Sequence, residues 1–259
     1  MKRKTRFEGF LMTSNFAIEG STPLYKEVER EIMQCLARGE WKPGDRLPSE
    51  PELAERFGVA VFTIRAGIQK LVESGVLLRR QGKGTFVALY RARPLRNQFL
   101  RIFSNDGLKA SWDRELISVT KARASDEIAS VLKLGTTAAD QAVYEVLFLL
   151  KNEGKVVAFV ESKMSARILR GVTEAALKDT AENLYAVFQE RFGVNVIRIE
   201  ERVRAGRAGR TGARWLAIDA SDPILRIERV SYTYNDVPVE FRRYNVQADS
   251  YYYFAAPTG

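Results

Sequence analysis

The sequence predicts a multidomain protein: a winged helix-turn-helix (α+β) followed by a larger α+β domain on an antiparallel sheet. Its 259 residues, 46% of them hydrophobic, are enough for two modest cores. Two short helical patterns, separated by a Gly-Val corner, precede a glycine-bearing hairpin at residues 76–87. The rest of the chain is rich in strand patterns, with too few helices for an alternating βαβ series.

The first helical pattern begins at Ser21 or Thr22, with Pro23 in its first turn, and Gly39 ends it. The chain's only cysteine falls on the apolar face of this helix, so we expect a buried thiol. A single cysteine allows no intramolecular disulfide and fits a reducing cytoplasm. The residues expected on the apolar face are Leu24, Val28, Ile32, Cys35 and Leu36.

The helix-turn-helix follows a turn-rich connection. Ser49 is a suitable N-cap for a short helix that Gly58 closes, and a second helix is expected from about Ala60 to Ser74, where Gly75 stops it. The apolar residues expected on one face of this second helix are Ile64, Ile68, Leu71 and Val72.

The hairpin after Gly75 reads "VLLRRQGKGTFVAL", which indicates two short strands joined by Gln-Gly-Lys-Gly. Its glycines allow the tip to turn and to approach a partner closely, while its basic residues suit phosphates or a narrow minor groove. Repulsion between these charges is relieved when DNA binding neutralises them and releases counterions. A solvated basic hairpin is the alternative, but the position directly after a helix-turn-helix favours DNA binding.

The charge distribution supports the same interpretation. Lys and Arg number 41 against 32 Asp and Glu, a net charge of +9, and residues 1–93 alone hold 17 basic and 11 acidic residues. A basic first third favours a polyanionic partner, with a solvated basic surface as the alternative. The absence of histidine excludes Ser-His-Asp and Cys-His catalytic sites and His-bearing zinc sites. We expect no metal and no cofactor.

No apolar stretch reaches the roughly 18 residues that a membrane span requires. The basic start of the chain is followed by "TSNFAIEG", which is not the apolar region of a signal peptide. We therefore expect a cytoplasmic protein without a membrane partner.

The predicted domain boundaries follow from these patterns: a basic tail at 1–20, the winged helix-turn-helix at 21–89, a linker at 90–101 and the α+β domain at 102–259. In the last, helices are expected in "SDEIASVLKLG", ending at Gly135, in "AENLYAVFQERFG", ending at Gly193, and in "ARWLAID". Strands are expected in "AVYEVLFLLKNEGKVVAFVESKM", with a turn at Asn-Glu-Gly, and in "VNVIRIEERVRAG", "PILRIERVSYTYNDVPVEFRRYNVQA" and "YYYF".

Two sets of motifs carry a family resemblance. With "GDRLPSEPELAERFGV" and "RRQGKGTFV", residues 23–88 resemble the winged helix-turn-helix of GntR-type bacterial transcription regulators. With "LKLG", "NLYAVFQERFGV", "PILRIERVSYTYNDVPVEF" and Asp249 among aromatics, residues from about 95 to 255 resemble the UTRA domain of the HutC branch. The resemblance implies a chorismate-lyase-like fold, a homodimer formed by the C-terminal domain, and a repressor on palindromic double-stranded operator DNA. It also implies a small-molecule effector that changes operator affinity.

The resemblance implies DNA-contacting positions as well. The family usually has an arginine where this chain has Pro51, and polar or basic residues where it has Val61 and Phe62. Neither apolar side chain can hydrogen-bond to guanine, though both can contact a thymine methyl, so we expect a different sequence preference. Packing against a neighbouring domain is the alternative for Phe62. The residues expected to contact DNA are Arg46, Ser49, Glu50, Thr63, Arg65, Lys70, Arg79, Arg80, Gln81, Gly82, Lys83, Gly84 and Thr85.

The effector positions depart from the family too. Members that bind phosphosugars carry an Arg-x-Arg pair on the strand that here reads "LFLL", at 147–150. We therefore expect an effector less anionic and more apolar than a sugar phosphate, with Arg242 or Arg243 able to pair one carboxylate. A structural surface pair between Glu240 and Arg242 is an equal alternative. The residues expected at the effector are Tyr144, Glu161, Ser162, Glu240, Arg242 and Tyr244.

Two rival functions stay open. The chorismate-lyase-like fold leaves an enzyme possible, with carboxylates as acid or base, and Glu240, Glu161, Tyr144 and Tyr244 as its candidates. No two carboxylates stand at a recognisable spacing, and the attached DNA-binding head favours sensing, so we expect no enzyme. The second rival is effector-independent DNA binding, with a degenerate pocket that Leu147, Phe148 and Leu149 fill.

Overall fold

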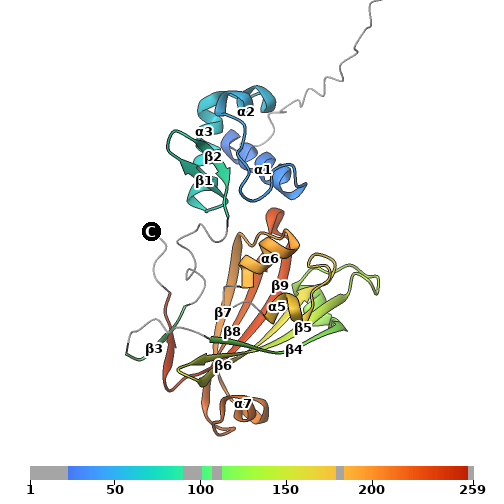
Figure 1. The fold of residues 1–259 in the computed structure, drawn as a ribbon, viewed down its shortest axis with the longest axis vertical. Coiled ribbons are helices and arrows are strands. Elements are labelled where there is room, and N and C mark those ends of the chain that lie inside the picture. The colour runs from blue at the N-terminus through green and yellow to red at the C-terminus, as the bar shows by residue number, and fades with distance from the viewer. Residues whose placement is uncertain (1–22, 90–100, 107–112, 179–183, 256–259) are drawn as a thin grey trace, which may run out of the picture.

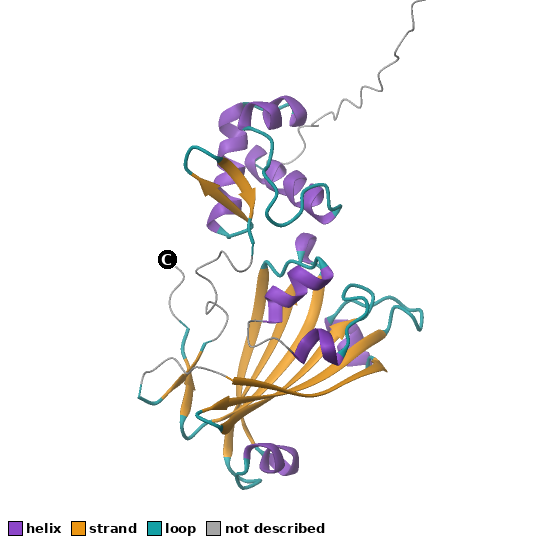
Figure 2. Cartoon of the chain, viewed as in Figure 1, coloured by secondary structure: helices purple, strands orange, loops and turns teal. Residues whose placement is uncertain are grey.

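The computed structural model describes residues 23–89, 101–106, 113–178 and 184–255, which form an N-terminal head and a larger domain on a six-stranded sheet (Figure 1). Both parts combine helices with antiparallel strands, as an α+β fold does (Figure 2). The predicted tail and all but the last residue of the predicted linker lie outside the described residues, so the domain boundaries stay predictions there.

The head is a winged helix-turn-helix, as predicted. α1 starts one residue later than expected, because Pro23 has an extended ψ of 133° and caps the helix from outside, and Leu24 is exposed rather than in the core. The wing strands pair antiparallel with Arg80 opposite Gly84. The elements are α1 (Leu24–Ala37), α2 (Glu50–Phe57), α3 (Val61–Glu73), β1 (Leu77–Arg80) and β2 (Gly84–Val87).

Local chemistry fixes the start and the end of α2. The Ser49 hydroxyl accepts a hydrogen bond from the Glu52 amide, and the Glu52 carboxylate accepts one from the Ser49 amide at 2.7 Å, which forms a capping box. Gly58 ends the helix in a left-handed conformation with φ 67°. Behind this helix, a shared core includes Ile32, Cys35, Leu53, Ile64 and Ile68, each no more than 1% exposed.

The C-terminal domain is built on one antiparallel sheet in the order β4-β5-β6-β9-β8-β7. Glu153 and Gly154, with φ 50° and 78°, form the tight turn between β5 and β6 at the predicted place. Its strands are β4 (Asp113–Arg123), β5 (Ala142–Asn152), β6 (Lys155–Ser165), β7 (Arg198–Arg207), β8 (Pro223–Tyr232) and β9 (Pro238–Gln247).

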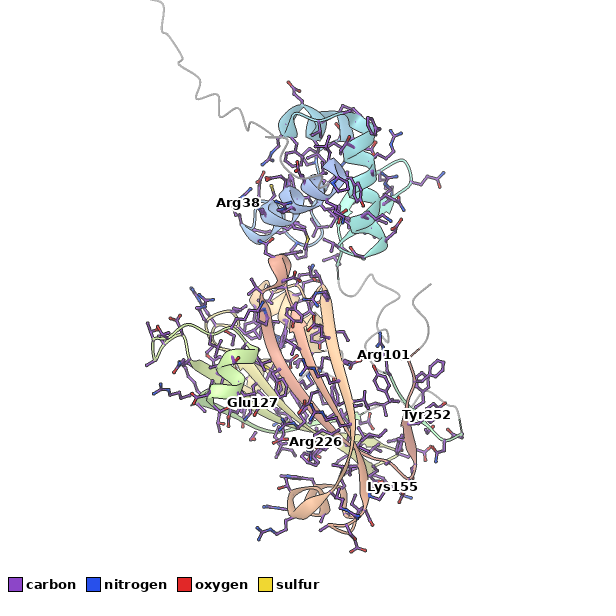
Figure 3. All side chains as sticks on the ribbon, turned by 180° about the vertical axis from the view of Figure 1, so that it is seen from behind. Arg38, Arg101, Glu127, Lys155, Arg226 and Tyr252 are labelled. Carbon is purple, nitrogen blue, oxygen red and sulfur yellow. The ribbon has the colours of Figure 1, made fainter. Side chains whose placement is uncertain are left out.

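A two-stranded ribbon lies beside this sheet. It pairs β3 (Ile102–Ser104) with β10 (Tyr251–Tyr253), so the ends of the domain meet in one small element. In Figure 3, Arg101 and Tyr252 mark this ribbon, and Lys155, at the β5–β6 turn, lies at the end of the sheet away from the head.

Helices cover both faces of the sheet. The inner face packs against α5 (Glu174–Lys178) and α6 (Leu184–Phe192), whose residues share the largest core with Phe148, Met164 and Tyr244. The outer face packs against α4 (Asp126–Val131) and α7 (Gly209–Leu216), which form two smaller cores.

Two helices of the C-terminal domain differ from the predicted ranges. α4 ends at Val131 rather than Gly135, because Lys133 takes a left-handed φ of 48°. α7 begins at Gly209, four residues before the predicted segment, and ends before Ala217, whose φ is 54°. The short α5 and the long β4 were not predicted.

Candidate functional site

One face of α3 is open to solvent and lies next to the wing. Val61, Phe62, Arg65, Ala66 and Gln69 are all exposed, while the opposite side of the helix is buried in the head. Residues spaced by three and four lie on one face of a helix, so these side chains form a continuous stripe, here called the α3 stripe. A helix with such an exposed stripe has the shape that enters a major groove.

Glu50 connects this stripe to the wing. Its carboxylate lies 2.9 Å from Arg65 Nε and 2.7 Å from Arg79 Nη2, so α2, α3 and β1 each contribute one charged group to a single patch. Both arginines are substantially exposed, so each ion pair contributes no more than about 1 kcal/mol to stability. The main consequence is positional: both guanidinium groups lie on the same face as the α3 stripe.

The wing presents its charges at a glycine turn. Gly82 and Gly84 have φ 69° and 106°, a region that other residues rarely adopt. A Cβ at Gly84 would lie 2.9 Å from Arg46 Nε, so the guanidinium of Arg46 packs directly against this glycine. Arg80 covers the Phe86 ring at 5.0 Å, and Lys83 lies exposed at the tip together with Gln81.

Other predicted DNA contacts have different surroundings. Thr63 is only 4% exposed and packs inside the head, so its side chain does not lie on the α3 stripe. The Ser49 hydroxyl takes part in the capping box. Lys70 lies 2.8 Å from Glu73 near the end of α3, and this hydrogen bond raises the pKa of its ammonium group. Thr85, on β2, is partly buried opposite Arg79.

The inner face of the sheet carries a cluster of polar side chains around Glu240. The Glu240 carboxylate accepts a hydrogen bond from Ser162 Oγ at 2.5 Å and from Ser231 Oγ at 3.3 Å. Arg242 Nη2 lies 2.7 and 2.8 Å from its two oxygens, and Nη1 donates to Tyr244 Oη at 2.9 Å. Four predicted effector residues therefore meet, and three of them stand at alternate positions of β9.

The cluster extends to side chains that the sequence analysis missed. Arg229 donates to Glu201 from Nε at 2.9 Å, and the hydroxyl groups of Tyr185 and Ser231 lie 2.7 Å apart. These residues escaped notice because an arginine and a glutamate on a strand usually lie in solvent, and only their alternation with apolar residues hints at burial. The buried polar cluster comprises Ser162, Tyr185, Glu201, Arg229, Ser231, Glu240, Arg242 and Tyr244.

Glu240 and Arg242 do not form a surface pair, because they are only 0% and 8% exposed. Burial lowers the pKa of Arg242, but the Glu240 carboxylate, together with Tyr244 and Tyr185, outweighs burial and raises that pKa well above its usual value. Burial, and next the charge of Arg242, lower the pKa of the neighbouring Arg114 to about 10. Both guanidinium groups are therefore charged at neutral pH.

The remaining effector candidates do not all join this cluster. The Tyr144 hydroxyl accepts a hydrogen bond from the Gly171 amide at 3.2 Å, on the inner side. Glu161 alternates with Ser162 and lies on the outer face, where Asn245 Nδ2 is 3.5 Å away. Arg243 is also on the outer face and pairs with Glu228 at 2.9 Å. The structure thus separates Glu161 and Arg243 from Glu240.

The leucines that replace the family's Arg-x-Arg pair do not fill one pocket. Phe148 belongs to the inner core, whereas Leu149 belongs to the outer core that α7 covers, and Leu147 packs beside Leu149. The degenerate-pocket interpretation required these side chains to gather on one side of the sheet.

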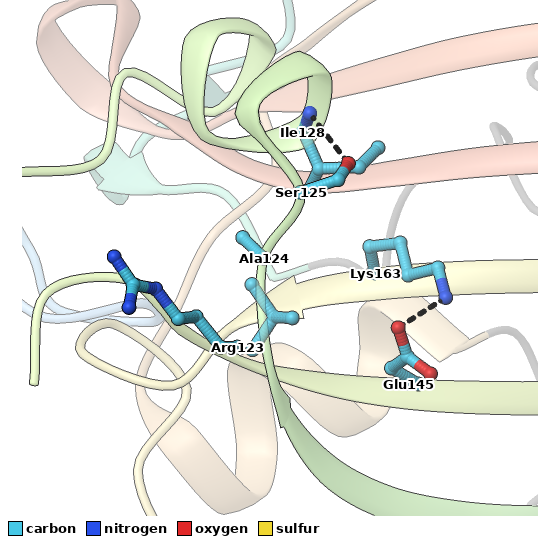
Figure 4. Close-up of a pocket in the computed structure, with 7 residues that line it drawn as sticks. Arg123, Ala124, Ser125, Ile128, Glu145 and Lys163 are labelled. Carbon is cyan, nitrogen blue, oxygen red and sulfur yellow. Dashed lines mark hydrogen bonds and ion pairs between the residues drawn. The ribbon is translucent and has the colours of Figure 1, made fainter. Parts of the chain in front are cut away.

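A pocket of about 370 Å³ opens on the outer side of the sheet beside α4 (Figure 4). Lys163 and Glu145 form an ion pair at 2.5 Å on one wall, and Ser125, which caps α4, lies on another. None of the predicted effector residues lines it. The lining residues are Arg123, Ala124, Ser125, Ile128, Val143, Glu145 and Lys163.

The two domains touch through the β8–β9 turn. The short turn η3 (Tyr234–Asp236) lies directly below α1 in Figure 1, and Tyr234 is buried within the core of the head. Asn195 donates to the Tyr234 hydroxyl, and Gln189 Nε2 lies 3.1 Å from Asn195 Oδ1 and 3.4 Å from the carbonyl oxygen of Ala88. A tyrosine of the C-terminal domain thus completes the packing of the head.

Within the described parts of the chain, no group of three or more Asp, Glu, Cys or His side chains is arranged to hold a metal ion. Among the helices described, none is long and apolar enough to cross a bilayer.

Comparisons with known proteins agree with this architecture. The chain is similar to the histidine utilization repressor of Pseudomonas putida (28% identical; 83% of this chain, 84% of the relative). It is also similar to the Escherichia coli K12 protein named probable fructoselysine utilization operon transcriptional repressor (27% identical; 83% of this chain, 87% of the relative). These alignments span most of both domains. The solved ligand-binding domain of a GntR-family transcriptional regulator from Bordetella bronchiseptica is also similar, with 27% identity and a TM-score of 0.58. The match covers 62% of this chain and 98% of the Bordetella bronchiseptica domain.

The family assignment rests on two matches. Residues 24–87 match the family described as bacterial regulatory proteins, gntR family, and residues 109–252 match the UTRA domain. The first range contains the α3 stripe and the wing, and the second contains the whole buried polar cluster. The chain belongs to the GntR family of bacterial transcription regulators, in the branch that carries a C-terminal UTRA domain.

Proposed function

We propose that this protein is a cytoplasmic transcriptional repressor that binds operator DNA as a homodimer. Its affinity for the operator falls or rises when a small molecule binds the UTRA domain. The observation that carries the DNA-binding part is the Glu50 bridge, which gathers Arg65 and Arg79 beside the α3 stripe. Relatives named as repressors support the direction of regulation.

The proposed effector site is the inner face of the sheet beside the buried polar cluster. Desolvating charged groups is expensive, so a network of this size on an otherwise apolar face is weakly explained by stability alone. Tyr144, Ser162, Glu240, Arg242 and Tyr244 lie on this face, and we propose them as effector residues. The α4 pocket is the second candidate, because its ion pair offers both signs of charge.

The chemical class of the effector follows from what β5 lacks. At 147–150 both faces of the strand present only apolar side chains, so no arginine pair is there to hold a phosphate. We propose an effector that is less anionic and more apolar than a sugar phosphate. The names of the relatives point to chemically unrelated compounds and do not identify it.

The route from effector to head runs through two elements. α6 carries Tyr185 in the polar cluster and, one turn later, Gln189 at the head. The β8–β9 turn contributes Tyr234 to the core of the head, and β9 contributes Glu240 to the buried polar cluster. A ligand that binds one arrangement of the cluster better than another would therefore shift the position of the head.

The sensor interpretation is also favoured over an enzyme. Glu240 already accepts hydrogen bonds from Ser162, Ser231 and Arg242, which leaves it poorly placed to take a proton from a substrate. The family is one of transcription regulators, and we propose that this chain has no catalytic activity.

A screen of metabolites by thermal unfolding tests the proposal. A ligand at about 100 times its dissociation constant should stabilise the protein by roughly 2.7 kcal/mol and change its affinity for operator DNA. Tyr244→Phe should weaken a ligand held at the inner face, whereas Lys163→Met should weaken one held in the α4 pocket. Conversion of the ligand to a product would contradict the sensor interpretation, and no stabilisation by any ligand would favour effector-independent binding.

A further inference from the structure

The leading turn of α3 exposes apolar side chains where a DNA-reading helix usually carries polar ones. Phe62 is 75% exposed and Val61 37%, and no large apolar side chain in the described part of the head is more exposed than Phe62. Neither residue belongs to the core of the head. A solvent-exposed phenylalanine at this position is explained by a partner that covers its ring.

The surroundings of Phe62 indicate the nature of that partner. Arg65 follows one turn later, with its side chain 63% exposed, and Glu50 holds it together with Arg79 on the same patch. The wing adds Arg80 and Lys83, and the first turn of α3 contains no acidic residue. A rim of cations around an apolar centre complements a polyanion that offers an apolar group within a groove.

Only one base presents such a group in the major groove, since thymine alone carries a methyl at C5. The neighbouring Ala66 is small, which allows the backbone of α3 to approach the bases. Along the helix, Phe62 and Arg65 are separated by about 4.5 Å, between one and two base-pair steps of about 3.4 Å.

We propose that Phe62, supported by Val61, reads a thymine methyl in each operator half-site, and that Arg65 contacts a guanine one or two base pairs away. This inference rests on the proposed DNA-binding function and adds the base that the head selects. An arginine or glutamine at the position of Phe62 would select a base by hydrogen bonds, whereas Phe62 selects it by removing a methyl group and a ring from water.

The test uses the full-length protein and deoxyuridine, which differs from thymidine only by the missing methyl. Duplexes selected from a random pool are resynthesised with each half-site thymine replaced in turn, and affinities are measured at one salt concentration. At one position the replacement should weaken binding about fourfold, the value expected for one buried methyl. Phe62→Ala should bind the thymine and deoxyuridine duplexes equally, and since Phe62 is exposed, the variant should fold normally.

Leu24→Ala is the matched control, since Leu24 is an exposed apolar side chain of α1 outside the α3 stripe, and its removal should leave thymine discrimination intact. Sequence-specific binding with equal affinity for thymine and deoxyuridine at every position would overturn the inference and leave the proposed function standing. If Phe62→Ala still binds the thymine duplex more tightly than the deoxyuridine duplex, the inference is overturned as well. Failure to bind any duplex would overturn both, and a Phe62→Ala change in oligomeric state without DNA would assign the ring to a protein contact instead.

Discussion

Asn195 donates a hydrogen bond to the Tyr234 hydroxyl at 2.8 Å, and the tyrosine ring that it orients is packed in the core of the DNA-binding head. Asn195 is itself buried and receives a hydrogen bond from Gln189. The position of the head is thus tied to α6 and β9, the two elements that also contribute to the buried polar cluster. The following predictions test this contact and the two sites on either side of it.

Removal of the Tyr234 ring should loosen the head without unfolding the sheet domain. Cys35, the chain's only cysteine, is 1% exposed in the head core, and burial raises the pKa of its thiol, so native protein should react slowly with thiol reagents. Tyr234→Ala removes a buried aromatic ring from the same core, which destabilises by about 3–5 kcal/mol in a well-packed site. The measurement is the rate of Cys35 labelling in native buffer, which should rise at least tenfold.

Tyr252→Ala is the matched control, because this exposed tyrosine belongs to the β3–β10 ribbon, and its labelling rate should stay that of the wild type. Equal labelling rates for Tyr234→Ala and the wild type would mean that the head does not depend on the β8–β9 turn in solution.

Breaking the buried ion pair should destabilise the UTRA domain. Arg242→Met leaves the Glu240 carboxylate buried without its guanidinium, which is expected to lower the free energy of unfolding by about 3–5 kcal/mol. The double variant Glu240→Gln/Arg242→Met should recover part of this loss, since it removes the unpaired charge. Urea unfolding followed by fluorescence measures both. A single variant as stable as the wild type would contradict the strength of this pair.

Glu50→Gln should free Arg65 and Arg79 from their shared carboxylate. We expect tighter sequence-independent DNA binding, because one negative charge leaves the patch, and a smaller ratio of specific to non-specific affinity, because the arginines lose their fixed positions. Titrations with operator and with random duplex at several salt concentrations measure this ratio. Glu73→Gln makes the same change of charge at the far end of α3, beside Lys70, and should alter the ratio less.

Arg65→Ala tests the helix directly. A base or phosphate contact should be worth about 1–3 kcal/mol of operator binding. Operator affinity equal to that of the wild type would assign the side chain a structural role in the Glu50 bridge.

Gly67→Ala tests the packing of α3 on α1. An added Cβ would lie 2.7 Å from Val28 Cγ1 and 3.1 Å from the Tyr25 carbonyl oxygen, so the helices must move apart. Overpacking of this kind costs about 1–3 kcal/mol, which a thermal unfolding curve of the head would show. Gln69→Ala, on the exposed side of the same helix, should change stability by less than about 0.5 kcal/mol.

The head could be predicted from the sequence because its signals are local. Ser49 and Gly58 mark the ends of one helix, and the glycines of the wing mark its turn. The same reasoning placed α4 and α7 with errors of several residues, because left-handed residues such as Lys133 and Ala217 end them without a glycine signal. β4 escaped prediction because its mostly exposed and half-buried residues lack a clear alternation.

The residues of the polar cluster that lie on β9 were predictable from the sequence, and most of those contributed by other elements were not. Alternation along β9 brought Glu240, Arg242 and Tyr244 to one face, as period two requires. Adjacent residues on a strand point to opposite faces, so Ser162 joins the cluster and Glu161 does not, and an effector role for Glu161 stays a prediction. The contributions of Tyr185 and Arg229 depend on which strands and helices meet, which no local pattern encodes.

Operator recognition by a dimer is tested most directly by a selection of bound sequences from random duplex DNA, with the full-length protein at a stated salt concentration. The expected result is a palindromic motif with two half-sites, each recognised by one head of the dimer. Binding that is strongly salt-dependent but blind to sequence would contradict it, because the α3 stripe would then contribute charge to the complex without reading the bases.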